Sequence, residues 1–264
     1  MKHPMLTIAK RAAEEAGNII VRGFRQLDQI QVQEKGRADL VSWVDQQAEV
    51  AIRSVLSDKF PSHQFLGEEM GASGADAAEY LWVIDPLDGT TNFLHGLPHF
   101  AVSIALVKQG KLELGLVYNP ISEEWFTAAR GEGALLNGRR LRVNALREPS
   151  RAIVATGFPT RTPERLPEQY ALVSSVLEKF GDIRRLGAAA LDLCYVACGR
   201  QDGYFELGIK PWDIAAGVLI AQEAGAIVTD FKGETCAYDS ERVVCANAYL
   251  HKQLLSQVQK ISAN

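Results

Sequence analysis

Acidic residues that follow short apolar runs are the side chains of this sequence best suited to chemistry. Asp85 and Asp88 lie three positions apart, directly after the apolar residues 82–84. Pro86 fixes its backbone φ angle and lacks an amide hydrogen, so we expect the chain to turn there. Two carboxylates on a rigid turn can converge on one point, and carboxylate oxygens suit Mg²⁺ or Mn²⁺. The pair therefore indicates a metal site, with a turn in which Asp88 caps a helix as the alternative.

The residues after Asp88 are typical of a helix start. Gly89 continues the turn, and Thr90, Thr91 and Asn92 are favoured at a helix N-terminus. Backbone amides that point out of a helix N-terminus can bind an anion. The amides of Gly89 and Thr90 are therefore candidates to receive a phosphate group.

Three further acidic residues stand near the ends of expected elements. Glu68 follows an apolar run and Gly67, Asp213 follows Lys210-Pro211-Trp212 at a helix start, and Asp45 precedes another helical stretch. Each has a purely structural explanation. Glu68 fits a solvated loop, Asp213 is favoured by the helix dipole, and Asp45 fits an N-cap. Spacing and periodicity alone do not bring these residues together.

The elements that must position these residues follow from hydrophobic periodicity. Helices come first, then a run of strands, then an alternating half, which favours layered sheets and helices over one parallel sheet. We expect a hairpin turn at Gln109-Gly110, a connection between halves at 130–150, and a helix ended by Gly225. The expected helices are 5–27, 45–60, 165–180, 189–199, 212–224 and 248–261; the expected strands are 63–66, 81–84, 100–107, 112–118, 124–129, 183–186, 203–207, 227–229 and 243–246.

Composition excludes several classes of protein. The chain has 264 residues, 47% of them hydrophobic, with 28 Lys and Arg against 32 Asp and Glu, a net charge of -4. These values exclude a disordered or collagen-like chain and argue against strong binding to nucleic acid or to an anionic membrane. Charged residues at 10, 11, 14 and 15 interrupt any signal peptide, so we expect a cytoplasmic protein. The four cysteines are expected to be reduced and mostly buried.

Three stretches taken together resemble the inositol monophosphatase family of Mg²⁺-dependent, lithium-sensitive phosphatases. They are Gly-Glu-Glu at 67–69, Trp-Val-Ile-Asp-Pro-Leu-Asp-Gly-Thr-Thr-Asn-Phe at 82–93 and Trp-Asp-Ile-Ala-Ala-Gly at 212–217. The segments 186–193 and 157–159 are similar to its bacterial SuhB-like branch. The resemblance covers about residues 5–260. It implies an α+β layered sandwich (αβαβα) like that of fructose-bisphosphatase, built as a single domain, 1–264, with halves of roughly 1–145 and 146–264.

The resemblance also implies the site. A cluster of two or three Mg²⁺ ions, with Mn²⁺ as a substitute and Li⁺ as an inhibitor, would be held by Glu68, Asp85, Asp88, Asp213 and the carbonyl of Leu87. Catalysis would involve Glu68, Thr90 and Asp45. The substrate would be bound by Asp88, Gly89, Thr90, Ala189, Glu206 and Asp213.

The implied activity is hydrolysis of myo-inositol monophosphates by metal-activated water. Two alternatives remain open. The same chemistry could serve fructose-1,6-bisphosphate, histidinol phosphate, NADP or a 3′-phosphonucleotide. The chain could instead act mainly as a SuhB-type partner in transcription or ribosome biogenesis, with RNA polymerase and antitermination factors as partners. The resemblance further implies a homodimer. Trp43 and Met70 depart from the family pattern near the site, which leaves substrate preference open.

Overall fold

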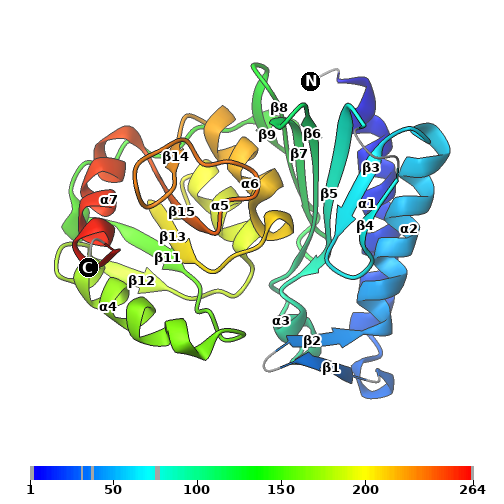
Figure 1. Cartoon of the computed structure of the whole chain (residues 1–264), viewed down its shortest axis with the longest axis horizontal. Helices are drawn as coiled ribbons and strands as arrows, with labels where there is room; N and C mark the ends of the chain where they lie inside the picture. Colours follow the sequence, from blue (N-terminus) through cyan, green and yellow to red (C-terminus); the bar gives the residue numbers. More distant parts are fainter. Residues whose placement is uncertain (1–2, 31, 37–38, 75–77, 263–264) are drawn as a thin grey trace.

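Five alternating layers of helix and sheet make up the structure (Figure 1). A computed structural model describes residues 3–30, 32–36, 39–74 and 78–262. The layers run from a helix pair, through an eight-stranded sheet, a second helix pair and a five-stranded sheet, to a third helix pair. This is the αβαβα sandwich expected from the sequence, so the prediction of fold class is confirmed.

The first helix pair covers the outer face of the eight-stranded sheet. It consists of α1 (Pro4–Phe24) and α2 (Trp43–Lys59), with the hairpin β1 (Val32–Gly36) and β2 (Asp39–Ser42) between them. The sheet order is β10-β9-β8-β7-β6-β5-β3-β4, and only β3 and β5 are parallel. Its strands are β3 (Gln64–Gly67), β4 (Gly71–Ser73), β5 (Tyr80–Asp88), β6 (Ala101–Lys108), β7 (Lys111–Asn119), β8 (Glu124–Ala129), β9 (Gly133–Leu136) and β10 (Arg139–Arg140).

The second sheet has the order β12-β11-β13-β15-β14, and α3 (Thr90–Leu94) connects β5 to β6. Helices α5 and α6 lie between the sheets, while α4 and α7 cover the far face of the second one (Figure 1). The elements are β11 (Ile153–Thr156), α4 (Leu166–Leu177), β12 (Asp182–Arg184), α5 (Ala189–Ala197), β13 (Gly203–Leu207), α6 (Pro211–Glu223), β14 (Ile227–Thr229), β15 (Arg242–Ala246) and α7 (Ala248–Ser262).

Both faces of the eight-stranded sheet are buried, since each is covered by a helix pair. Successive side chains of a strand point to opposite faces, so each strand contributes to both cores. In β5, Trp82 and Ile84 pack with α1 and α2. Val83, which lies between them, packs with α5 and α6. The strand therefore reads as a continuous apolar run up to Asp85.

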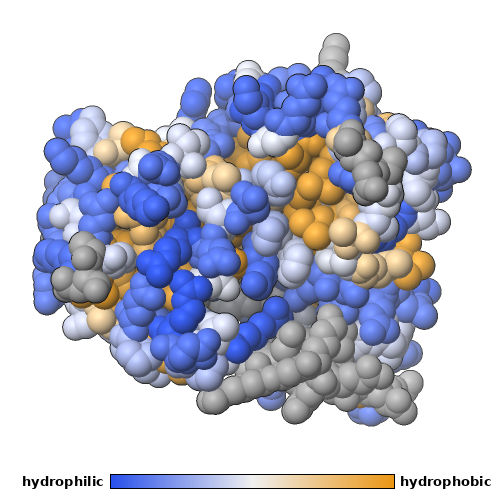
Figure 2. Space-filling view, viewed as in Figure 1, coloured by the Kyte–Doolittle hydropathy of each residue, from blue (hydrophilic) through white to orange (hydrophobic). Residues whose placement is uncertain are grey.

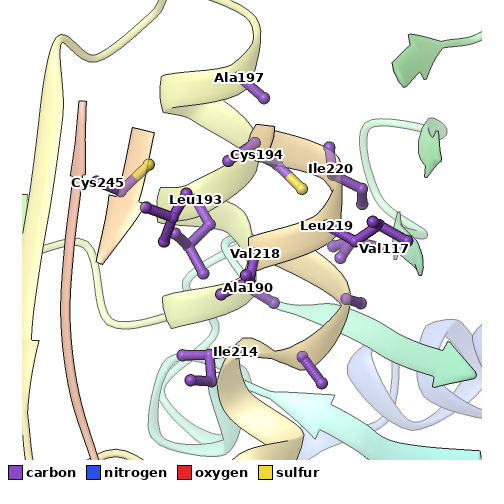
Figure 3. Packing of buried hydrophobic residues seen from close by; sticks show 14 of the residues in the cluster. Val117, Ala190, Leu193, Cys194, Ala197, Ile214, Val218, Leu219, Ile220 and Cys245 are labelled. Carbon is purple, nitrogen blue, oxygen red and sulfur yellow. The ribbon is translucent and has the colours of Figure 1, made fainter. Parts of the chain in front are cut away.

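The central helix pair is buried on nearly every side. Leu193 of α5 and Val218 of α6 belong to one core with the facing strands (Figure 3). Glycine permits a close approach of backbones here: a Cβ atom on Gly115 of β7 would lie 2.6 Å from the carbonyl oxygen of Ala216. Helix α6 therefore packs tightly against the first sheet, and this contact fixes the position of the N-terminus of α6.

Most expected elements are present, and the Gln109-Gly110 turn is confirmed by positive φ angles of 49° and 77°. Two expectations are wrong. Asp45 is not an N-cap, because Ser42 caps α2 and Asp45 is its third residue. Pro86 does not end the strand, because β5 passes it with a register shift against β6. The segment 130–150 contains the strands β9 and β10, and its role as a connection between halves stays a prediction.

Polar residues dominate the face shown in Figure 2, where apolar residues gather mainly over the eight-stranded sheet. No helix in the described ranges is long and apolar enough to cross a membrane. The cysteines 194, 236 and 245 are buried, Cys198 is half-buried, and all four are unpaired, as expected. The division into halves at about residue 145 stays a prediction.

Candidate active site

A cavity of about 330 Å³ lies where ends of both sheets and of the central helices meet. Its wall contains nine of the ten residues proposed for the site, and the tenth, Asp45, hydrogen-bonds to a residue of the wall. The nine come from the ends of β3 and β5, the start of α3, the starts of α5 and α6, and β13. They are Glu68, Asp85, Leu87, Asp88, Gly89, Thr90, Ala189, Glu206 and Asp213.

Parallel pairing of β3 with β5 brings Glu68 beside Asp85. Gly67 pairs with Ile84, and the amide of Glu68 donates to the carbonyl of Ile84 at 3.2 Å. Parallel strands end at the same edge of a sheet, so the residues that follow them are neighbours. The spacing of 17 positions in the sequence gives no sign of this.

A bulge in β5 presents Asp85 and Asp88 to the cavity. The pairing of β5 with β6 shifts register between these two residues. The Oδ1 atom of Asp85 accepts a hydrogen bond from the amide of Leu87 at 2.9 Å. This bond stabilises a local turn within the strand. Bulges re-aim side chains without ending a strand, so both carboxylates are fixed to the sheet itself.

The turn that carries Glu68 rests on a buried ion pair that sequence reasoning missed. Glu49 of α2 is fully buried and lies 2.6 Å from Arg53. Its Oε2 accepts the amide hydrogen of Glu69 at 2.8 Å, while Arg53 donates to the hydroxyl of Ser73. The pair thus ties both sides of the β3–β4 turn to α2. A Glu–Arg pair four apart usually indicates an exposed helix face, so this spacing does not predict the buried role of the pair.

The two central helices supply the opposite wall. The Oδ2 atom of Asp213 accepts the amide hydrogen of Lys210 at 2.8 Å, which fixes the carboxylate in the first turn of α6. The Oδ2 atom of Asp88 accepts the amide hydrogen of Ala190 at 2.8 Å in the first turn of α5. The hydrogen bond of Asp88 therefore links β5 of the first sheet to the first turn of α5 in the central layer.

Asn92 is a second positioning residue that sequence reasoning did not single out for this role. Its side-chain amide donates to the carbonyls of His99 and Leu186, both at 2.8 Å. These bonds hold α3 against the segment that leads into α5. Gly89, which begins α3, has a φ angle of 97°, a left-handed conformation that favours glycine. The position of the Gly89 and Thr90 amides therefore depends on both sides of the cavity.

Thr90 and Asp45 form a hydrogen-bonded pair at the edge of the cavity. The Thr90 hydroxyl oxygen lies 2.9 Å from Asp45 Oδ1 and 3.0 Å from the carbonyl oxygen of Leu87. Its single proton can be donated to one of these acceptors at a time. The other oxygen of Asp45 accepts from the amide and hydroxyl of Ser42, at 2.9 Å and 2.7 Å. The capping interaction of α2 therefore orients Asp45 toward Thr90.

Burial and mutual repulsion dominate the electrostatics of the carboxylates. Burial, and then the charges of Glu68, Asp88 and Asp213, raise the pKa of Asp85 well above its ordinary value. Burial and the charge of Asp213 do the same to Asp88, and burial raises the pKa of Asp213 to about 6. The protein thus gathers like charges at a cost to its stability, a frequent property of functional sites.

The donor set fits a hard divalent cation. Carboxylate and carbonyl oxygens are the ligands that Mg²⁺ takes, and an added cation would relieve the repulsion that raises these pKa values. In the ranges that the structure describes, no three His, Cys, Asp or Glu side chains already form a metal-binding group. Arg161 lies 3.1 Å from Glu68, so at least this carboxylate must exchange its partner before it can coordinate a metal.

Glu206 of β13 lies in the part of the cavity wall that the second sheet supplies. The hydroxyl of Tyr204 donates to its Oε2 at 2.7 Å, and burial raises the pKa of Glu206. A Cβ atom on Gly157 would come within 2.1 Å of its Oε1, so only glycine leaves room for the carboxylate. Asp192, also in the wall, has its pKa raised to about 8 by burial. This side of the cavity therefore combines hydrogen-bond acceptors with groups that hold protons readily.

Four residues near the signature stretches lie outside the wall of the cavity in the described ranges. Trp43 and Met70 are exposed at 43% and 50%. In the described part of the chain, neither residue lines the cavity, and His95 and His99 do not line it either. Basic residues that the sequence analysis did not single out do line it. They are Arg161, Arg165, Arg185 and Lys210.

The fold and this acidic cavity are those of a family of phosphatases. Residues 1–263 match the model of the inositol monophosphatase family, and the chain belongs to that family.

Individual relatives and solved structures agree with this assignment. The chain is 48% identical to the Nus factor SuhB of Pasteurella multocida, over 97% of this chain and 96% of that protein. Its fold is similar to that of the extragenic suppressor protein suhB from Bartonella henselae, with a TM-score of 0.93, 41% identity, and coverage of 98% and 99%. It is also similar to SaIMPase-II, solved with inositol monophosphate bound, with a TM-score of 0.80, 26% identity, and coverage of 98% and 94%.

Proposed function

We propose that this protein is a Mg²⁺-dependent phosphatase of small phosphate monoesters, with myo-inositol monophosphate as its preferred substrate. Family membership supports a phosphatase. The observation that carries the proposal is the joint presence in one cavity of acidic metal-type donors, the Thr90–Asp45 pair and Glu206. A relative of similar fold was solved with inositol monophosphate bound, which supports the choice of substrate.

The metal ligands in this proposal are Glu68, Asp85, Asp88 and Asp213, with the carbonyl of Leu87. When bound, Mg²⁺ would offset the negative charge of the phosphate dianion and make water a better nucleophile. Glu68 directly follows β3, Asp85 and Asp88 lie in β5, and Asp213 lies in the first turn of α6, so the carboxylates are fixed to the eight-stranded sheet and to the central helix layer. Such a site needs little reorganisation when charge develops on the reacting phosphate.

Thr90 and Asp45 are proposed to orient the attacking water. When Thr90 donates its proton to Asp45, the lone pairs of its hydroxyl oxygen can accept a hydrogen bond from a water molecule in the cavity. Burial is the largest influence on Asp45 and raises its pKa, which makes its carboxylate a stronger acceptor of a proton. Ser42 keeps this carboxylate aimed at Thr90.

Glu206 is proposed to recognise the polyol. The Tyr204 hydroxyl donates to one of its oxygens, and Glu206 lies beside Gly157 in the wall of the same cavity as the proposed metal ligands. A carboxylate accepts hydrogen bonds from sugar hydroxyls but repels a second phosphate placed against it. The amide of Gly89, the amide of Thr90 and the backbone at Ala189 complete the proposed substrate contacts.

A substrate panel tests this proposal. The purified protein, with Mg²⁺ present, would be assayed for phosphate release from inositol 1-phosphate, fructose-1,6-bisphosphate, histidinol phosphate, NADP and a 3′-phosphonucleotide. We expect the highest kcat/KM for inositol 1-phosphate and loss of all activity in Asp85→Asn. A higher kcat/KM for another substrate would refute the inositol assignment, and unchanged activity in Asp85→Asn would refute the metal site.

A second role is proposed because relatives that cover the chain end to end are named as Nus factors. In this role the protein would bind transcription antitermination factors and RNA polymerase. We also propose a homodimer, on the basis of the family resemblance. A pull-down with RNA polymerase, using both the wild type and Asp85→Asn, tests it. Equal capture by both would separate binding from catalysis, and no capture by either would refute the role. Light scattering would test the dimer.

A further inference from the structure

Arg161 places a positive charge against the acidic cluster of the cavity. Its Nη2 atom lies 3.1 Å from Oε1 of Glu68 and donates a hydrogen bond to it. Burial raises the pKa of Asp213 overall, and the charge of Arg161 is one of the influences that oppose this rise. Glu68 follows β3 of the first sheet and Asp213 begins α6, so the guanidinium acts where carboxylates from two layers converge.

The backbone beside Arg161 is held independently of this ion pair. The side-chain amide of Gln169 donates to the hydroxyl of Thr156 and to the carbonyl of Gly157, at 2.9 Å and 2.7 Å. The amide of Thr162 donates to the carbonyl of Pro159 at 3.0 Å. These hydrogen bonds hold the backbone around Arg161 without involving its side chain.

The side chain itself has room to move. Arg161 is 44% exposed, whereas Glu68 is 13% exposed. A long and partly solvated arginine side chain can turn its head group into water while its stem stays in place. The head group of Arg161 is therefore much more accessible to water than the carboxylate that it contacts.

A guanidinium and a divalent cation compete for the same carboxylate. Both need the lone pairs of Glu68, and a positive charge beside a carboxylate lowers the affinity of that site for a second cation. Arg165, which lines the same cavity, has its Nη1 atom 3.9 Å from Oε2 of Glu241, which is not a proposed metal ligand. The two arginines therefore differ in whether they contact a proposed metal ligand.

We propose that Arg161 is a tethered cation that neutralises Glu68 in the metal-free protein and has to leave it for a divalent metal to bind. Arg161 thereby sets the metal affinity of the site. This inference rests on the proposed metal site and adds a residue that limits its occupancy. A released guanidinium stays beside the cavity, where it can meet an anionic substrate.

Metal binding measured by isothermal titration tests the inference. Metal-free wild type, Arg161→Gln, Arg161→Lys and Arg165→Gln would each be titrated with Mg²⁺ and with Mn²⁺, and their melting temperatures measured without metal. We expect Arg161→Gln to bind both metals about two- to fivefold more tightly, the range that follows from an ion pair with one partly exposed partner. We also expect it to melt lower than the wild type without metal.

The two other variants serve as matched controls. Arg165→Gln removes the same charge from the same cavity and should leave metal affinity within error of the wild type. Arg161→Lys keeps the charge and should fall between the wild type and Arg161→Gln. Equal or weaker metal binding in Arg161→Gln, with binding abolished in Asp85→Asn, would overturn the role of Arg161 alone. Metal binding that Asp85→Asn does not affect would overturn the metal site and this inference with it.

Discussion

Replacing Asp213 with asparagine should stabilise the metal-free protein at neutral pH. The substitution keeps an oxygen that can accept the amide hydrogen of Lys210, so the cap of α6 is retained while the charge is removed. Burial raises the pKa of Asp213 from 3.8 to about 6 in the folded protein. A raised carboxylate pKa means that the folded state binds the proton more tightly than the unfolded state.

The sign and size of the effect follow from this linkage. As pH rises from about 4 through about 6, the ionised Asp213 progressively destabilises the folded protein. The difference of about 2 pH units corresponds to about 3 kcal/mol at full effect. Asp213 is only partly shielded from solvent, which screens its charge, so we expect about 1–3 kcal/mol.

Chemical denaturation at two pH values measures the effect. Wild type and Asp213→Asn, both stripped of metal with a chelator, would be unfolded in urea at pH 8 and at pH 4. We expect the variant to be more stable at pH 8 and equal to the wild type at pH 4. With Mg²⁺ added at pH 8, the wild type should gain more stability than the variant. A variant that is less stable than the wild type at pH 8 would refute the electrostatic argument.

Three further predictions concern catalysis, recognition and packing. Thr90→Ala should lower kcat by about 10²–10⁴-fold with a smaller change in KM, because it removes a proposed proton-transfer partner; steady-state kinetics would show this, and a loss confined to KM would indicate phosphate binding instead. Glu206→Ala should raise KM for inositol 1-phosphate and relatively favour bulkier or doubly phosphorylated substrates; an unchanged ranking in a substrate panel would remove Glu206 from the substrate site. Gly115→Val should lower the free energy of unfolding by about 2–4 kcal/mol, because its side chain would collide with the backbone of Ala216; thermal melting within 1–2 °C of the wild type would argue against the tight contact.

Local patterns predicted the elements well where they were long and regular. The strands β6, β7 and β8 and the turn at Gln109-Gly110 follow from alternation and from turn chemistry. Strand β11 was not predicted, because its four residues follow the irregular stretch 130–150 and a short apolar run is ambiguous between a strand and other buried segments. The strands β9 and β10 were missed because they lie in a stretch rich in glycine and arginine, which is typical of a connection.

The site could be predicted only through the family resemblance. Sequence spacing places Asp85 near Asp88, but Glu68 reaches them through the parallel pairing of β3 with β5, and Asp213 through the packing of α6. Glu49 was overlooked because burial of a charged helix residue is decided by the turn that packs on it. Arg161 was overlooked because nothing local marks a loop arginine that contacts Glu68 across the cavity.

The central position of α5 and α6 has a consequence for the synthesis of the protein. The eight-stranded sheet is complete once residue 140 has been translated, yet one of its faces is covered only by residues 189–223. Until the ribosome has made that segment, side chains such as Val83, Val117 and Phe126 remain exposed on the nascent chain. Exposed apolar surface of this kind favours aggregation and recruits chaperones. Slow translation between these two points should therefore reduce the soluble yield more than slow translation after residue 223.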